Sequence, residues 1–451
     1  MPVLMKAQKY LAVSTFALCA TLFHAAPLRA ASTTADAAAA VSTSADVAAD
    51  ITSPEPQAAA PAAAPAPAAA PAAPPTWSVG PIDFSGLVDG YYNFNANHPS
   101  TGQNQLRNFD FDANSFSLNM VKLSMAHSPD PIGFQVDLGF GKAFNIFGGG
   151  ISSCNGGLPS SQCDSGNDVN LEQAYVAWKP TKGKGFEADF GQFVTSASAE
   201  VIETMNNPNY SRSLLFVYTV PYYHMGLRTS MPITKKETVG FQLVNGWNNI
   251  TDNNAGKTIG LTSLYTAKLF NWALNYYVGP ENTGTDQGYR NLIDTTLNLT
   301  TTAKWTSYIN YDYVQNRNAA QIGTTGRYQT TNLYHRQGVA FESRYQATGT
   351  LALSGRYEYL VDGSDIGDTG GTSTLITANA ANTAHAAGFN KSTLQEFTIT
   401  GEYKVAAGML ARLEYRRDND DNNFFQKGTS KFVRSQSTLE LGVVAFFGPH
   451  R

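Results

Sequence analysis

The feature that most constrains this chain is an alternation of apolar and polar residues with a period of two, which recurs from residue 77 to residue 451. For example, Leu351, Leu353, Tyr357 and Tyr359 are separated by small, polar or charged residues. A period of two is that of a β-strand, whose successive side chains point to opposite faces of the sheet. The alternation therefore predicts an all-β fold for this part of the chain.

The polar face of these predicted strands carries charges. Near the C-terminus, Leu413 and Tyr415 alternate with Arg412, Glu414 and Arg416. A soluble sandwich would bury the apolar face, whereas a membrane barrel turns that face to lipid and encloses the polar one. Alternation alone does not distinguish these two arrangements.

The lengths of the connections between predicted strands favour the barrel. Long connections, such as Asn97–Asp110, Ser196–Ser213 and Gln315–Asn332, alternate along the chain with short ones, such as Ser128–Pro131 and Ala406–Gly408. Outer-membrane barrels have short periplasmic turns, long extracellular loops and an even number of strands. We therefore expect a transmembrane antiparallel β-barrel of about 16 strands, with both of its ends on the side of the short turns.

Two further patterns agree with a membrane barrel. The last predicted strand, Glu440–Phe447, has the spacing of the assembly signal of outer-membrane proteins, so the barrel-assembly machinery is an expected partner. Aromatic residues near strand ends suit the girdles at the two membrane interfaces. These residues are Tyr91, Tyr92, Trp178, Trp247, Trp272, Trp305, Tyr311 and Tyr313.

The segment before residue 77 divides into two parts. Lys6 and Lys9 precede an apolar run from Leu11 to Phe23, so residues 1–30 are predicted to be a signal peptide. Residues 31–76 are rich in Ala and Pro and offer little apolar surface to bury, which predicts a disordered periplasmic tether. A bare spacer is preferred for this tether, with contact to peptidoglycan as the alternative. Residues 77–451 form the predicted barrel.

Composition excludes two other classes of protein. The formal net charge is -4, and the 31 Lys and Arg residues are spread along the chain, so no nucleic-acid surface is expected. After residue 30, no run reaches the ~20 apolar residues of a transmembrane helix. A helical transporter or channel is therefore excluded.

Several stretches resemble the OmpL-like outer-membrane beta-barrel porin family. The stretches that carry the resemblance are GLVDGYYNFN from Gly86, EVIETMNNPNYSRSLLF from Glu200, PYYHMGLR from Pro221, NGWNNITDNNAGKTIG from Asn245 and LEYRRDNDDNNFF from Leu413. The resemblance implies a pore in the bacterial outer membrane. It implies no particular substrate.

The connection Ser196–Ser213 is the candidate for the narrowest part of such a pore. It carries Glu200, Glu203 and Arg212. A short helical turn that bears carboxylates and folds into the lumen opposite arginines would narrow the pore and create a transverse field. The alternative is a solvated surface loop.

The charged wall opposite this loop follows from the alternation. It predicts that a set of arginines faces the lumen, namely Arg228, Arg336, Arg344, Arg356, Arg412 and Arg416. It predicts the same direction for Glu342, Glu358, Glu402 and Glu414. Such pairs either filter ions or only stiffen the wall.

Other chemistry has less support in the sequence. Cys154 and Cys163 share one predicted external loop in an oxidising compartment, which favours a disulfide over a metal or redox site. The histidines outside the signal peptide are not paired at metal-ligand spacing, so no metal is expected. A catalytic site assembled from distant strands is a minor alternative, and no cofactor is expected.

Together these patterns predict a porin of the bacterial outer membrane for the passive diffusion of small hydrophilic solutes or ions. The main alternative is a structural or adhesive barrel that does not conduct, and a barrel enzyme is the third. The expected partners are outer-membrane lipids, the solutes themselves and, by analogy with general porins of this size, further copies of the chain.

Overall fold

The computed structural model describes residues 77–148, 169–322, 326–363 and 392–448. The predicted signal peptide, the tether and the loop with Cys154 and Cys163 lie outside the described residues. Among the described residues, no helix is long and apolar enough to cross a membrane.

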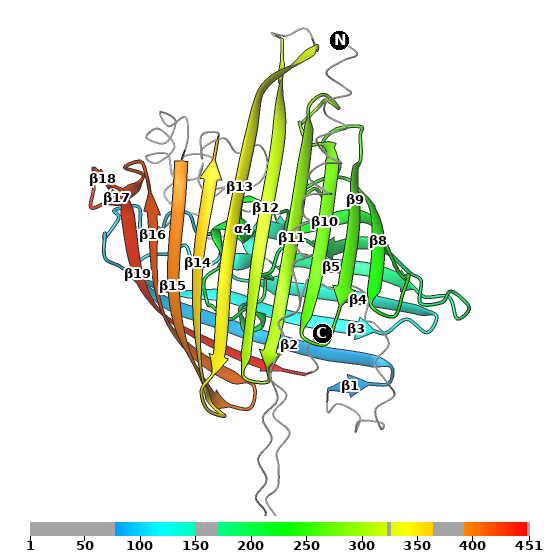
Figure 1. The fold of residues 1–451 in the computed structure, drawn as a ribbon, viewed down its shortest axis with the longest axis horizontal. Coiled ribbons are helices and arrows are strands. Elements are labelled where there is room, and N and C mark those ends of the chain that lie inside the picture. Colours follow the sequence, from blue (N-terminus) through cyan, green and yellow to red (C-terminus); the bar gives the residue numbers. More distant parts are fainter. Residues whose placement is uncertain (1–76, 149–168, 323–325, 364–391, 449–451) are drawn as a thin grey trace, which may run out of the picture. The chain divides into compact units, whose positions relative to one another are not determined.

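Sixteen antiparallel strands form a closed barrel, as the alternation and the connections predicted (Figure 1). The strands are β2 (Ile82–Asn95), β3 (Ser115–His127), β4 (Ile132–Phe140), β5 (Asn170–Trp178), β6 (Glu187–Val194), β7 (Tyr223–Pro232), β8 (Glu237–Val244), β9 (Thr258–Thr266), β10 (Phe270–Pro280), β11 (Tyr289–Thr302), β12 (Trp305–Gln321), β13 (Tyr328–Gln346), β14 (Leu351–Asp362), β15 (Ser392–Ala406), β16 (Met409–Asp420) and β19 (Ser435–Phe447). The last strand, β19, pairs with the first, β2, from Thr438↔Asn95 to Phe447↔Gly86. This pairing leaves no open edge.

Three short strands lie outside the barrel wall. At the end with the short turns, β1 (Ser78–Val79) pairs with the start of β2. In the connection between β16 and β19, β17 (Phe425–Lys427) and β18 (Lys431–Val433) form a hairpin of their own.

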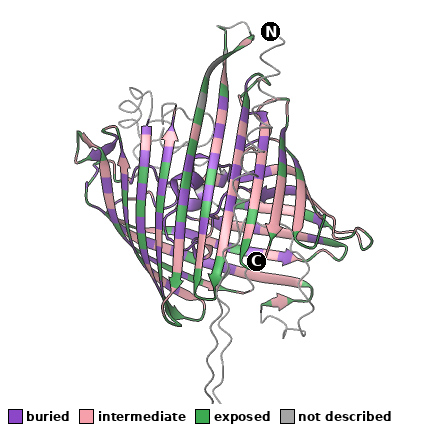
Figure 2. Ribbon diagram, viewed as in Figure 1, coloured by how far each residue is buried: buried purple, intermediate pink, exposed green. Residues whose placement is uncertain are grey.

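Buried and exposed residues alternate along the strands of the wall (Figure 2). In β14 the pattern of exposure alternates almost without interruption, with Leu353 49% exposed and Arg356 1% exposed. In β16, Leu413 is 55% exposed, whereas Arg412 and Arg416 are buried. The apolar face therefore points outward and the charged face inward, which rules out the soluble sandwich.

Two sequence expectations about the wall were wrong in detail. The predicted loop Gln315–Asn332 is mostly strand, because β12 and β13 remain paired up to Gln321↔Tyr328. Trp247 does not belong to an aromatic girdle. It is 2% exposed and lies over the guanidinium of Arg290, 4.7 Å from the ring centre. Tyr91 is likewise buried, because it falls on the inner face of β2.

Candidate functional site

The connection between β6 and β7, residues 195–222, folds into the barrel and is called the lumen loop here. All of its residues are buried except Ser196, Val201, Glu203 and Asn206, which are half-buried. Its two helical turns are η4 (Thr204–Asn206) and α4 (Leu214–Tyr218). Neither turn contains a carboxylate, in contrast to the predicted acidic turn, because Glu200 and Glu203 precede η4.

Arg356 on β14 makes the most extensive contact with the lumen loop. Its guanidinium donates to Glu200 Oε1 at 2.6 Å and to the carbonyl of Ser211 at 2.8 Å. The same group pairs with Glu396 on β15 at 3.2 Å. The other oxygen of Glu200 accepts from the backbone N–H of Ser213 at 2.6 Å. Glu200 therefore fastens the loop to the wall and also joins its two halves.

Carboxylates of the wall accept hydrogen bonds from the loop backbone. Glu414 accepts from the N–H groups of Tyr210 at 2.6 Å and Ser211 at 3.0 Å. Glu358 accepts from the N–H of Leu214 at 2.7 Å, at the start of α4. The first N–H groups of a helix have no partner within the helix, so Glu358 satisfies a donor that would otherwise be buried without one.

Arginines of the wall donate to carbonyls of the same loop. Arg412 donates to the carbonyl of Thr204 at 2.6 Å and pairs with Glu402 at 2.7 Å. Arg416 donates to the carbonyl of Arg212 at 2.5 Å and pairs with Asp418 at 2.8 Å. These predicted lumen residues thus contact the loop backbone.

Arg212 differs from these arginines, because it belongs to the loop and not to the wall. Arg212 lies within the loop, where it donates to the carbonyls of Val201, Ile202 and Tyr210 and lies over the ring of Phe109. Burial lowers the pKa of Arg212, although nearby carboxylates oppose that shift.

Three arginines pair with carboxylates on the same or an adjoining part of the wall. Arg228 pairs with Asp189 at 2.7 Å, Arg336 with Asp362 at 3.0 Å, and Arg344 with Glu402 at 2.8 Å. The structure therefore brings Glu200, Arg356, Arg412 and Arg416 together around the loop. It places Arg228 and Arg336 in separate pairs, whereas Arg344 shares Glu402 with Arg412.

Asp89 on β2 is an anchor that sequence reasoning missed. It accepts from Tyr210 Oη at 2.6 Å, from Thr204 Oγ1 at 2.5 Å and from Asn119 at 2.9 Å. The ring of Tyr210 lies directly on Gly442 of β19, where a Cβ atom would overlap the ring. The loop therefore touches the wall at the seam where the barrel closes.

Lys122 on β3 is the second residue that was missed, and it contacts the half-buried edge of the loop. Its ammonium pairs with Glu203 of the loop, with Glu172 on β5 at 2.8 Å and with Asp137 on β4 at 3.1 Å. Burial alone would raise the pKa of Glu203, but Lys122 outweighs it and holds that pKa below its ordinary value of 4.5. Alternation with Val121 and Leu123 could have identified Lys122 as an inward residue.

This cluster around Lys122 contains more acidic groups than basic ones. One ammonium faces three carboxylates, so the formal sum is +1 - 3 = -2. The side chain of Glu203 is 18% exposed, whereas that of Glu200 is 1% exposed. Water therefore reaches Glu203 more readily than Glu200.

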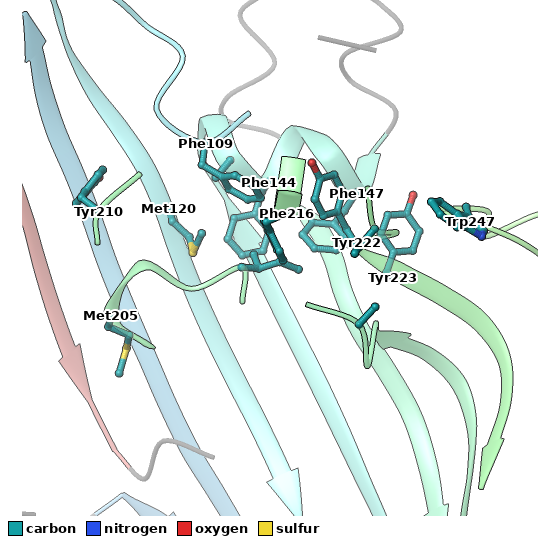
Figure 3. Packing of buried hydrophobic residues seen from close by; sticks show 14 of the residues in the cluster. Phe109, Met120, Phe144, Phe147, Met205, Tyr210, Phe216, Tyr222, Tyr223 and Trp247 are labelled. Atoms are coloured by element: carbon teal, nitrogen blue, oxygen red, sulfur yellow. The ribbon is translucent and has the colours of Figure 1, made fainter. Parts of the chain in front are cut away.

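Aromatic side chains of the lumen loop and of two other connections pack together inside the barrel (Figure 3). Phe216 of α4 lies between Phe109 and Tyr222, with ring centres 5.7 and 5.3 Å away. Phe144 and Phe147, which follow β4, continue the cluster, with their ring centres 5.7 Å apart. All five side chains are buried. An apolar core therefore occupies part of the barrel interior, and a second apolar cluster contains Leu214 and Leu215 of α4.

A family model for OmpL-like beta-barrel porins, beta-barrel porin-2, matches residues 81–447. The chain belongs to this porin family. Membership of this family and the closed barrel place the protein in the bacterial outer membrane. The family and the fold are those of a channel.

Solved structures with a similar fold are also outer-membrane porins. The OmpF–daunomycin complex of Salmonella typhi is 13% identical, with a TM-score of 0.50 over 81% of this chain and 97% of that one. The anion-selective porin from Comamonas acidovorans is 10% identical, with a TM-score of 0.49 over 81% and 99%. At these identities the likeness concerns the fold alone. No curated protein sequence matches the chain.

Proposed function

We propose that this porin lets small hydrophilic solutes and ions diffuse passively through the barrel, with the lumen loop at the narrowest part of the path. The observation that carries the proposal is the fastening of residues 195–222 inside the barrel, from Asp89 on β2 to Glu358 on β14. A loop held at so many points narrows a lumen without moving in the flow of solute. The proposal assigns no reaction and no cofactor to the chain.

Within this proposal, the residues predicted from the sequence receive different roles. Glu203 and Lys122 form the charged edge that a passing ion meets, because the carboxylate of Glu203 is partly open to water. Glu200, Arg212 and the arginines of β14 and β16 hold the loop in place. Their charges are mostly compensated by partners within hydrogen-bond distance, so they contribute less to the field in the path.

The proposal is tested by planar-bilayer recordings on the purified, refolded chain. Single channels with an ohmic conductance, and swelling of liposomes in small neutral sugars, are the expected results. A correctly folded barrel that gives neither result would contradict passive diffusion.

A second function, a structural barrel that does not conduct, is favoured by the aromatic cluster. Phe109, Phe144 and Phe216 are each at most 1% exposed, so on their side of the lumen the interior is filled rather than lined. Replacement of Phe109 by Ala separates the two functions. Conductance that exists only in Phe109→Ala would support the closed barrel, whereas equal conductance in both proteins would support the porin.

The expected partners belong to the same proposal. They are the barrel-assembly machinery, outer-membrane lipids and further copies of the chain. Mass measurement of the refolded protein in detergent tests the last of these, because an oligomer and a single chain differ in mass by a whole multiple.

A further inference from the structure

On the outer face of β15, β16 and β19, the residues change from apolar to polar or charged near the end of the barrel that carries the long connections. Along β16, Leu413 and Tyr415 point outward and are 55% and 40% exposed. The next outward residue is Arg417, beside Ser437 on β19 and Phe397 on β15. On β16 the apolar band therefore ends between Tyr415 and Arg417, beside the exposed ring of Phe397. A boundary of this kind lies near the level where lipid head groups begin.

Arg417 is held by neutral partners. Its guanidinium donates to Asn419 Oδ1 at 3.1 Å, to Ser437 Oγ at 3.1 Å and to Ser435 Oγ at 3.0 Å. In the part of the chain that the structure describes, no carboxylate pairs with it. Its neighbour Arg416 faces the lumen and pairs with Asp418 at 2.8 Å. The charge of Arg417 is therefore oriented on the outer surface without being neutralised there.

Three more exposed cations lie close to Arg417 in the sequence. They are Lys427, Lys431 and Arg434, and with Arg417 they are called the basic rim. Lys427 and Lys431 are direct cross-strand partners in the β17–β18 hairpin, a position in which like charges are destabilising.

Acidic residues in the same segment do not balance this charge. Asp418 and Asp420 are buried, at 0% and 4% exposed, which leaves Asp421 as the exposed carboxylate. The exposed charges of residues 417–434 therefore sum to +4 - 1 = +3.

This surface combines an apolar part and a cationic part, which together suit an amphiphilic ligand. Below Arg417, the exposed side chains of Ile399, Leu413 and Leu439 offer an apolar face for acyl chains. At the boundary, guanidinium groups suit phosphate oxygens, which they bind through two parallel hydrogen bonds. Clusters of Lys and Arg beside a membrane-spanning segment recognise anionic lipid head groups. Long connections of outer-membrane barrels face the cell exterior.

We propose that the basic rim binds the phosphate-bearing head group of a glycolipid in the outer leaflet of the outer membrane. Arg417 is the central residue, because it is oriented before the lipid arrives. The inference rests on the outer-membrane location and is independent of whether the lumen conducts.

The test measures binding of lipid A that carries its phosphates to the refolded full-length chain in detergent, by native mass spectrometry. The variant combines Arg417→Gln with Arg434→Gln. It is expected to bind about thirtyfold more weakly, since each cation near a charged membrane surface contributes about a factor of five. Arg417→Lys, which keeps the charge but loses the two parallel hydrogen bonds, should bind with an affinity between those of the original chain and of Arg417→Gln.

A matched control removes the same charge from the opposite end of the barrel. Lys235→Gln with Lys236→Gln alters two exposed cations in the turn between β7 and β8 and should leave binding unchanged. An equal loss in this control would show general attraction of charge and would overturn the site.

Two further measurements identify the source of the phosphate. Dephosphorylated lipid A should bind equally tightly to the original chain and to the variant that combines Arg417→Gln with Arg434→Gln. Tighter binding to the original chain would overturn phosphate recognition. Complete displacement by millimolar inorganic phosphate would indicate a site for free anions instead of a lipid. Since Arg417 points outward from β16, Arg417→Gln by itself should conduct as the original chain does, so failure of the lipid site and failure of the porin proposal are distinguishable.

Discussion

Two groups of strands in the inner wall differ in charge: β13–β16 are called the charged half of this pair and β8–β10 the neutral half. In β13–β16, most inward positions that face the lumen loop are Arg, Glu or Asp. In β8–β10, the inward positions are Gly, Thr, Asn, Gln, Ala, Leu, Val or Tyr. The loop follows this division, because α4 and the segment before it contact the charged half.

The neutral half makes fewer contacts with the same loop. Gln242 donates to Ser196 Oγ at 3.0 Å, and Asn275 donates to the carbonyl of Ser196 at 2.9 Å. Charged side chains on the wall of a lumen are therefore not by themselves a filter for ions. Here five of them satisfy backbone groups of a loop that would otherwise be buried without partners, namely Arg356, Glu358, Arg412, Glu414 and Arg416.

The largest effect is expected from breaking the charged half at Arg356. Arg356→Ala leaves Glu200 buried without its cation and leaves Glu396 with Arg416 alone, which should lower the free energy of unfolding by about 3 to 5 kcal/mol. Urea titration of the barrel in lipid vesicles measures it. Gln242→Ala in the neutral half is the control and should cost about 1 kcal/mol. Equal costs would remove the distinction between the halves.

A smaller effect is expected on ion selectivity at Lys122. A unit charge about 7 Å from an ion in water changes its energy by about 0.6 kcal/mol, or about threefold in permeability ratio. Lys122→Gln should therefore shift the reversal potential under a salt gradient toward cation preference, and Glu203→Gln toward anion preference. Both shifts should shrink at about 1 M salt, where the Debye length is about 3 Å.

Glu200→Gln is the matched control for this measurement. Glu200 is buried and has partners on both oxygens, so its replacement should alter stability more than selectivity. If the reversal potential changes in Glu200→Gln and does not change in Glu203→Gln, the assignment of the charged edge to Glu203 is wrong.

The neutral half offers a sharper test, because a charge can be added there without breaking a contact network. Ala273 on β10 is half-buried and faces the lumen beside Asn275. Ala273→Lys should move the reversal potential toward anion preference, by no more than the Lys122 substitution. It should change the free energy of unfolding by less than about 0.5 kcal/mol. A large loss of stability would mean that this wall is packed as tightly as the opposite one.

The smallest effect is a dependence on pH through Glu203. Its pKa is lowered below 4.5, so its pairing with Lys122 stabilises the fold above pH 4.5 and is lost as the pH falls through the lower value. The contribution of Glu203 to the reversal potential should therefore be constant from pH 7 to about pH 5, and its loss below that range should shift the potential toward anion preference. The same titration on Glu203→Gln should lack this component.

The sequence predicted which face of a strand many residues of the candidate site occupy, but it did not predict which residues they contact. Alternation placed Arg356, Arg412 and Arg416 on the inner face, since the period of a strand depends only on local geometry. It could not show that Arg412 donates to the carbonyl of Thr204, because these residues are far apart in the sequence and meet only when the barrel closes. The same limit explains why Asp89 was missed as a partner of Tyr210.

The sequence by itself determined the strand-rich barrel, the outward apolar face and the end at which the long connections lie. Each of these properties follows from short-range rules that act within one strand or one turn. Only the tertiary structure decided that residues 195–222 enter the lumen and that Lys122 rather than an arginine contacts Glu203. The physical reason is that a buried polar group is stabilised by whichever partner the closed wall brings within hydrogen-bond distance, and the order of residues in the chain does not contain that distance.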